Sequence, residues 1–229
     1  MITYYTGSVF NAKAEAIVNT VNCTGVMGAG LALEFKLRYP EMYENYAEKC
    51  KTHNIQVGRM DYYQEKDKII INFPTKDYFM YPSKIEWIES GLKDFVASYK
   101  NHGIKSVAFP KLGSLNGGLE WNQVKPLMER YLSMVDADIF ICLDEDKEAD
   151  GLEKKMVDYY NNNFQLIIPQ VKRLSEQQKD ILKNALPLKR FWHLSILDKI
   201  GMTTYCKIFT VCKDAVENNS PQQISMFDI

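Results

Sequence analysis

The chain has 229 residues, of which 46% are hydrophobic and 25% charged, a composition that excludes disordered and fibrous proteins and allows one sizeable core with a small appendage. The formal net charge is −1, but residues 172–213 carry nine basic and three acidic side chains. This excess favours either an anionic partner or, more commonly, solvated lysines on a helix face.

Apolar runs alternate with helical patterns along the first 150 residues. The later runs are almost continuously apolar, as in a sheet covered on both faces. The helical segment 83–101 opens with a predicted Ser83–Glu86 capping box, and Pro126 in another segment indicates a kink or a later start. This order predicts an α/β fold, with a three-layer α/β/α domain over residues 1–150. The predicted strands are 2–5, 16–21, 68–73, 106–109 and 138–143, and the predicted helices are 31–39, 42–53, 83–101 and 119–135.

The pattern changes after residue 150. The segment GLEKKMVDYYNNNF predicts a helix that ends in asparagines, and residues 172–186 place Leu174, Ile181, Leu182 and Leu186 at helical spacing. We therefore expect a small, basic, mainly helical module over residues 151–217, with a winged helix as one candidate arrangement. Residues 218–229 are expected to form a flexible tail.

Two glycine-rich loops each follow an apolar strand and precede a helix. The first, NCTGVMGAG at 22–30, is neither a Walker A loop nor a dinucleotide-binding motif, and PKLGSLNGGLEW at 110–121 repeats its pattern. Free N–H groups at a helix start favour an anion, and ligands of α/β sheets bind beyond the carboxyl ends of the strands. A single loop of this kind is typical of a turn, whereas the pair indicates a pyrophosphate clamp.

Lys76 follows an apolar strand in the segment NFPTKDYFMYPSK. At the lip of a dry cleft, a lysine loses its proton more easily or stabilises developing negative charge, and both properties suit catalysis at a glycosidic carbon. The alternative is a solvated residue at a strand end, and Lys84 is a weaker candidate. The five cysteines form no C-x-x-C pair and the three histidines stand alone, so no metal site or catalytic histidine is expected.

Four segments, in this order, resemble a macrodomain of the DarG type, the antitoxin family that removes ADP-ribose from DNA. They are VNTVNCTGVMGAGLALEFKLRYP, INFPTK, IEWIESGL and FPKLGSLNGGLEW. They are also similar to terminal ADP-ribose protein glycohydrolase. The resemblance covers residues 1–150 and implies a macrodomain fold and a metal-independent ADP-ribosylglycohydrolase that needs no cofactor.

The resemblance also implies roles for individual residues. It makes Lys76 the catalytic residue, places Asn22 near the distal ribose, and assigns the first loop to that ribose and its phosphate and the second loop to the diphosphate. The substrate-binding residues that it implies are Ser8, Val9, Asn22, Thr24, Gly25, Val26, Met27, Gly28, Gly30, Pro110, Leu112, Gly113, Ser114, Leu115, Asn116 and Gly117.

Two positions depart from the wider family pattern. Ser8 stands where many macrodomains have an aspartate that binds adenine, which weakens the expectation of strong adenine selection. Asn116 stands where the protein glycohydrolase has an aspartate, and an amide cannot act as a general base at neutral pH. These residues favour the DNA-directed branch over hydrolysis of protein-linked ADP-ribose.

The expected function is removal of ADP-ribose from DNA, in particular from thymidine, by a cytoplasmic antitoxin. The expected partners are ADP-ribosylated DNA and a DarT-like toxin, and no association with a membrane is expected. The basic C-terminal module would bind DNA phosphates or the toxin. Two alternatives stay open: a hydrolase of protein-linked or small-molecule ADP-ribose derivatives, and a non-catalytic protein that binds ADP-ribose or sequesters the toxin. The tail residues Gln223, Ile224, Ser225, Met226 and Phe227 resemble a peptide that binds the bacterial sliding clamp, and the alternative is a tail that packs back onto its own domain.

Overall fold

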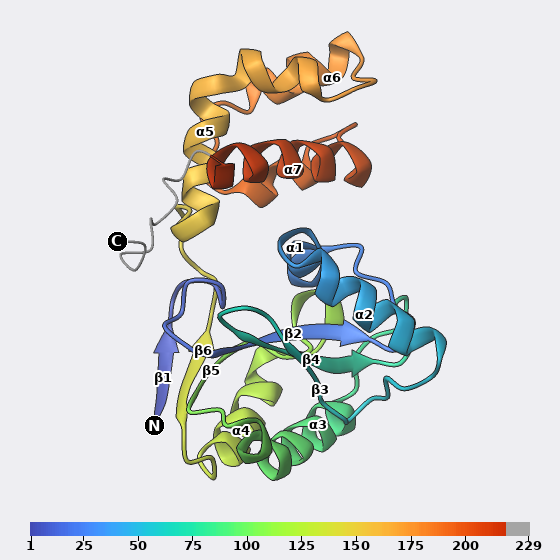
Figure 1. The fold of residues 1–229 in the computed structure, drawn as a ribbon, viewed down its shortest axis with the longest axis vertical. Helices are drawn as coiled ribbons and strands as arrows, with labels where there is room; N and C mark the ends of the chain where they lie inside the picture. Colours follow the sequence, from blue (N-terminus) through green and yellow to red (C-terminus); the bar gives the residue numbers. More distant parts are fainter. Residues whose placement is uncertain (219–229) are drawn as a thin grey trace, which may run out of the picture. The chain divides into compact units, whose positions relative to one another are not determined.

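The computed structural model describes residues 1–218, and the chain divides into two compact units, Met1–Glu145 and the residues from Asp146 onward (Figure 1). The first unit holds a six-stranded sheet with the strand order β1-β6-β5-β2-β4-β3. All neighbouring strands are parallel except β3, which runs antiparallel to β4. The strands are β1 (Ile2–Tyr5), β2 (Ala16–Asn22), β3 (Asp61–Gln64), β4 (Ile69–Lys76), β5 (Ser106–Pro110) and β6 (Asp138–Cys142).

Two pairs of helices cover the two faces of this sheet, so the predicted three-layer α/β/α architecture is confirmed. Within β2, Ile17 and Val21 pack with α1 and α2, whereas Ala16 and Val18 pack with α3 and α4. This alternation follows from the two-residue period of a strand. Figure 1 shows the two helix pairs on opposite sides of the sheet. The helices are α1 (Gly30–Arg38), α2 (Pro40–Lys51), α3 (Ile85–Ser98) and α4 (Trp121–Leu132).

Strand β3 was not predicted from the sequence. It has only four residues, DYYQ, and its side chains are half-buried or exposed, without the apolar run of the central strands. As an edge strand it owes its structure to the antiparallel ladder with β4, in which Tyr62 pairs with Ile71. This ladder depends on residues of β4 as well as β3, so the sequence of β3 alone does not predict the strand.

The predicted capping box at Ser83 is wrong. Helix α3 begins at Ile85, and its N-cap is Lys84, which makes no side-chain capping bond. The backbone N–H of Ser83 instead donates to the carbonyl of Gly117 at 2.9 Å. Ser83 is therefore held by the second glycine loop and not by its own helix. Pro126 is accommodated within α4, which begins at Trp121, five residues before it.

The strand ends position the two loops and the lysine. Strands β2, β4 and β5 are parallel, so their carboxyl ends lie at one edge of the sheet. A register shift between Val21 and Asn22 then makes Asn22 the partner of Lys76 across the β2–β4 ladder. The last residue of each strand therefore stands next to the other, at the entrance to the first glycine loop.

The second unit is helical in its described part. Helix α5 (Gly151–Ile167) is interrupted at its asparagines, as predicted, because Asn163 has the non-helical angles φ −126° and ψ 25° and kinks the helix there. A short helical stretch continues beyond the kink, with Phe164 and Ile167 buried. Asn161 donates to the carbonyl of Leu188 at 2.9 Å. Residues 146–218 contain no strand, so the β-hairpin of a winged helix is not found there. The other helices of this unit are α6 (Glu176–Asn184) and α7 (Met202–Asn218), with shorter 3-10 turns at Ile168–Gln170 and Phe191–Ile196.

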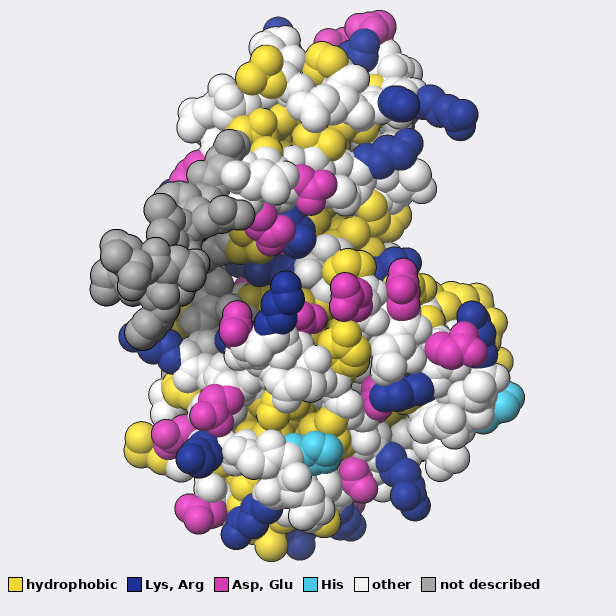
Figure 2. Space-filling view, in the orientation of Figure 1, with side chains coloured by type: hydrophobic (Ala, Val, Ile, Leu, Met, Phe, Trp, Pro, Cys, Tyr) yellow, Lys and Arg dark blue, Asp and Glu magenta, His cyan; other side chains and the backbone are white. Residues whose placement is uncertain are grey.

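The positive charge of the second unit is partly neutralised. Arg190 is buried and forms an ion pair with Glu153 at 3.0 Å. Lys179, Lys189 and Lys213 form ion pairs with glutamates at the surface. Figure 2 shows basic side chains on the surface of this unit near α6. The ion pairs account for part of the basic excess.

Of the predicted tail at 218–229, Asn218 is the last residue of α7, and residues 219–229, which include the clamp-binding sequence at 223–227, lie outside the described residues. Within residues 1–218, no helix combines the length and the apolar character needed to cross a membrane.

Candidate active site

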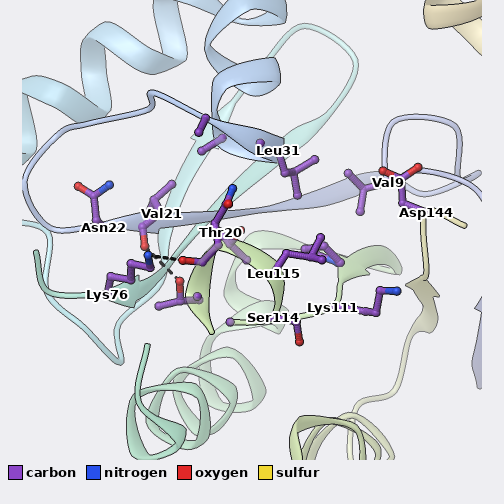
Figure 3. A pocket seen from close by; sticks show the side chains of 18 of the residues that line it. Val9, Thr20, Val21, Asn22, Leu31, Lys76, Lys111, Ser114, Leu115 and Asp144 are labelled. Carbon is purple, nitrogen blue, oxygen red and sulfur yellow. Dashed lines mark hydrogen bonds between the residues drawn. The ribbon is translucent and has the colours of Figure 1, made fainter. Parts of the chain in front are cut away.

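A cavity of about 610 Å3 opens in the first unit at the carboxyl ends of β2, β4, β5 and β6 (Figure 3). Its volume lies within the range of small-molecule sites. Both glycine loops and Lys76 contribute to its wall, so the structure brings the three predicted stretches together. The predicted residues that line it are Ser8, Val9, Asn22, Val26, Gly28, Gly30, Lys76, Pro110, Gly113, Ser114, Leu115, Asn116 and Gly117.

The two glycine loops approach each other at Gly30 and Asn116. Gly30 has a φ of +56°, and a Cβ atom at this position would overlap the side-chain Nδ2 of Asn116. Glycine at residue 30 therefore suits the positive φ, and it leaves room for the side-chain amide of Asn116, which a larger residue would push aside. Because Gly30 is also the first residue of α1, the free N–H groups of a helix start face the same cavity.

Asn22 shapes the first loop. Its side-chain Oδ1 accepts hydrogen bonds from the backbone N–H of Thr24 at 3.0 Å and of Val26 at 3.3 Å, and its Nδ2 donates to the carbonyl of Val26 at 2.6 Å. The side-chain amide thus replaces backbone partners that this tight turn lacks. The hydroxyl of Tyr46, from α2, donates to the carbonyl oxygen of Asn22 and so holds the end of β2 against α2.

Lys76 lies at one end of the cavity, next to Asn22 (Figure 3). Its Nζ donates a hydrogen bond to the backbone carbonyl of Asn116, which joins the end of β4 to the second glycine loop. The side chain is half-buried, and this desolvation lowers the pKa of the Lys76 amine below its ordinary value. A lysine with a lowered pKa is suited to act as a nucleophile or as a proton donor near neutral pH.

The opposite end of the cavity contains a carboxylate. Figure 3 shows Asp144 beside Val9, with Lys111 nearby, and Ser8 also lines the cavity. The Lys111 amine forms an ion pair with Glu145 at 3.1 Å. Among the described residues that line the cavity, Asp144 is the only acidic one. The cavity therefore extends from an amine at one end to a carboxylate at the other, with the glycine loops between them.

Four predicted binding residues do not line the cavity. Met27 and Leu112 are buried in the protein interior. Thr24 bonds through its hydroxyl to Asn22 at 2.8 Å. Gly25, with a φ of +79°, faces Cys50 and Ala47 of α2. These residues support the loops from behind.

Other residues that line the cavity were not predicted. Lys111 and Asp144 follow β5 and β6, and their positions at strand ends were the one signal in the sequence that could have indicated them. Phe79 and Met80 belong to the loop after β4, in which the sequence pattern pointed only to the lysines as functional residues. The cavity-lining residues that were not predicted are Thr20, Val21, Ala29, Leu31, Ala32, Thr75, Phe79, Met80, Lys111, Cys142, Leu143 and Asp144.

Comparison with known proteins relates this site to a family. Residues 18–128 match the Macro domain family. A DNA ADP-ribosyl glycohydrolase of Mycobacterium tuberculosis is 46% identical over 146 residues, which cover 62% of this chain and 42% of that protein. The matched region therefore spans less than half the length of this curated relative.

Two solved structures give the same relationship in three dimensions. The Thermosipho africanus DarTG in complex with ADP-ribose is 33% identical, with a TM-score of 0.61 and coverage of 67% of this chain and 44% of that one. The macrodomain of Mycobacterium tuberculosis DarG is 44% identical, with a TM-score of 0.60 and coverage of 62% of this chain and 97% of that one. With its three-layer fold and its paired glycine loops, the chain belongs to the macrodomain family and, within it, to the DarG type.

Proposed function

We propose that the first unit is a hydrolase that removes ADP-ribose from modified DNA, with thymidine as the modified nucleoside. The observation that carries this proposal is one cavity that has both glycine loops along its length and the half-buried amine of Lys76 at one end. A diphosphate needs backbone N–H groups, and a glycosidic bond needs a group that can take or give a proton.

We place ADP-ribose in this cavity in one orientation. The diphosphate lies between the two loops, near Gly30 and Gly113, where the start of α1 favours negative charge. The distal ribose then reaches Lys76 and Asn22, and the adenine reaches Val9 and Asp144. The carboxylate of Asp144 can accept a hydrogen bond from the amino group of adenine. Ser8 has only an uncharged hydroxyl group, so the negative charge at this end of the cavity comes from Asp144.

The reaction breaks the bond between the anomeric carbon of the distal ribose and the base nitrogen. The base leaves with the electron pair and gains a proton, and the anomeric carbon gains a hydroxyl group from water. Lys76 can serve this step in two ways. As a neutral amine it attacks the anomeric carbon and displaces the base, which takes up the proton that the amine loses; the ribose ring then opens by breaking the bond between the anomeric carbon and the ring oxygen, and water hydrolyses the resulting imine. As an ammonium group it donates its proton to the departing base. Borohydride trapping of a protein-bound ribose would distinguish the first role from the second.

The side chains near Lys76 support DNA over protein as the carrier of ADP-ribose. Asn116 supplies an amide and a backbone carbonyl to this end of the cavity, and neither is a base at neutral pH. The single carboxylate among the described lining residues, Asp144, lies at the far end. A mechanism that pairs a lysine with a carboxylate in the cavity therefore finds none among the described residues that line the Lys76 end.

The test is release of ADP-ribose from two substrates. The protein is incubated with single-stranded DNA that carries ADP-ribosylated thymidine and, separately, with a protein that carries ADP-ribosylated glutamate. We expect turnover of the DNA substrate and much slower release from the protein. Faster release from the protein would favour the alternative hydrolase, and binding of ADP-ribose without turnover of either substrate would favour a non-catalytic reader.

We also propose that the chain counteracts a DarT-like ADP-ribosyltransferase in the cytoplasm, where its DNA substrate is present. The similar structure from T. africanus is that of DarTG, a name that joins DarT and DarG. Coexpression tests this role: the intact chain should restore growth to cells that express such a transferase, and the Lys76→Ala chain should restore it less. Equal rescue by both chains would indicate that sequestration, and not hydrolysis, is the main effect.

The residues after the first unit have three proposed partners: DNA, the toxin and the sliding clamp. The exposed basic residues of the second unit, such as Lys172 and Arg173, would bind DNA phosphates or the toxin. Residues 223–227 would bind the sliding clamp, and a synthetic peptide of this sequence tests that binding directly. A DNA affinity that falls equally with salt in the intact chain and in a chain with both basic residues changed to alanine would contradict the DNA role.

A further inference from the structure

The loop between β4 and α3 exposes four large apolar side chains in a row. This aromatic loop comprises Tyr78, Phe79, Met80 and Tyr81, all of them at the surface. Tyr78 contacts Phe79 and Tyr81, with ring centroids 4.8 and 5.3 Å apart. Exposed apolar groups of this size, gathered in one segment, mark an interaction surface.

The two glycine loops hold the aromatic loop in place. At its start, the carbonyl of Asp77 accepts a hydrogen bond from the backbone N–H of Cys23 at 3.1 Å. At its end, the N–H of Ser83 donates to the carbonyl of Gly117 at 2.9 Å. The loop is therefore fixed at both ends to the walls of the cavity, and its rings do not depend on a partner for their position.

The aromatic loop stands at the end of the cavity where the substrate's acceptor must leave. It begins two residues after Lys76, and Phe79 and Met80 line the cavity themselves. Leu115, at the tip of the second glycine loop, is 88% exposed and adds a further apolar side chain. If the distal ribose lies at Lys76, the chemical group attached to that ribose passes over these residues.

We propose that the aromatic loop stacks on the bases of a single DNA strand beside the ADP-ribosylated nucleotide. This inference rests on the proposed function and names the surface that recognises the acceptor. Aromatic side chains bind single strands by stacking, without regard to sequence. The exposed Lys84 at the end of the loop, whose amine lies 4.7 Å from the ring centre of Trp87, supplies a cation for the phosphates. An enzyme that acts on a base needs that base outside a duplex stack, and flat rings at the rim suit such a strand.

Two substrates of different size test the proposal. One is a short single-stranded oligonucleotide with an ADP-ribosylated thymidine in its centre, and the other is the ADP-ribosylated nucleoside alone. Stacking on one base is worth enough to change kcat/KM roughly 5- to 100-fold. We expect a loss of this size for Tyr78→Ala on the oligonucleotide and no loss on the nucleoside. Tyr78→Phe should keep full activity on both, since it keeps the ring.

A matched control is available in Tyr4, which is 39% exposed against 38% for Tyr78 and lies on the edge strand β1. Tyr4→Ala should change neither rate. An equal loss for Tyr78→Ala on both substrates would show that the ring shapes the cavity, and an unchanged rate on the oligonucleotide would show that the loop does not touch DNA. Either result overturns the inference. A third result would also overturn it: Tyr78→Ala slows release of ADP-ribose from an ADP-ribosylated protein but not from the oligonucleotide. If the parent protein releases ADP-ribose from neither DNA substrate, the proposed function itself fails, and that result is distinct from the others.

Discussion

The side-chain amine of Lys76 donates a hydrogen bond to the backbone carbonyl of Asn116, forty residues further along the chain. This bond ties the end of β4 to the second glycine loop and directs the amine toward the cavity. Since the acceptor is a backbone oxygen, a substitution of Asn116 changes the side chain there and keeps the hydrogen-bond acceptor. The position of the amine and the chemistry of its neighbour can therefore be tested separately.

Lys76→Ala should leave binding of ADP-ribose intact and remove catalysis. Loss of one positioned charged group in a site of this kind costs on the order of 10²–10³ in rate. The rate of ADP-ribose release from modified DNA and the affinity for free ADP-ribose by calorimetry measure the two effects. Release at the parent rate would show that another residue acts on the glycosidic bond.

The Lys76 amine should titrate below the ordinary lysine range. Burial of the amine favours its neutral form, so the pKa is lowered, and the neutral fraction at a given pH is larger than for a solvated lysine. An NMR titration of the lysine side chains, with the Lys76→Arg spectrum to assign the signal, measures this pKa. A Lys76 signal that titrates together with the exposed lysines would contradict the proposed environment.

Asn116→Asp should raise the pKa of Lys76. A carboxylate near the amine favours the charged form, which opposes the effect of burial. In the same NMR titration the Lys76 signal should move to higher pH than in the parent protein. If hydrolysis of protein-linked ADP-ribose depends on a carboxylate here, the same variant should gain activity on that substrate relative to DNA. An unchanged titration would place the side chain of residue 116 away from the amine.

Gly30→Ala should weaken ADP-ribose binding by clashing with the second loop. The new Cβ would displace the side chain of Asn116. If the second loop shifts with it and one backbone N–H no longer reaches the phosphate, the lost hydrogen bond, worth about 1.5–3 kcal/mol, corresponds to roughly tenfold or more in affinity. Gly103→Ala is the matched control. Gly103 also has a positive φ, of +66°, but no heavy atom lies within 4 Å of the added Cβ. Equal affinities for the two variants would mean that the loops do not need this close approach.

Glu153→Ala should destabilise the second unit. It would leave Arg190, whose side chain is 8% exposed, buried without its carboxylate, and breaking a buried pair in this way costs about 3–5 kcal/mol. Asp158→Ala breaks the exposed Lys154–Asp158 pair and should cost at most about 0.5 kcal/mol. Denaturant unfolding compares the two, and equal costs would show that the buried pair does not stabilise this unit.

Much of the fold could be predicted from the sequence because its signals are local. The five parallel strands show apolar runs, and the three-layer order follows from their alternation with helical patterns. Strand β3 escaped prediction because its pairing with β4 is its main stabilisation. The capping box at Ser83 failed for a related reason, since Gly117 takes the backbone N–H of Ser83.

The sequence predicted the site residues whose type is restricted by backbone conformation or by chemistry, such as glycine and lysine. It did not predict the residues that reach the cavity only because a strand happens to end there. Gly30 and Lys76 stand out because their residue types are restricted by conformation or chemistry. Asp144 does not, because its place in the cavity depends on β6 ending beside the loop that contains Ser8 and Val9. Gly25 illustrates the opposite error, since it resembles a binding glycine but packs against α2.

The most direct test of the central claim is a crystal structure of the Lys76→Ala protein with ADP-ribose bound. We expect the diphosphate between the two glycine loops, the distal ribose beside residue 76 and the adenine beside Val9 and Asp144. ADP-ribose bound outside this cavity, or bound in it with the adenine at residue 76, would contradict the account.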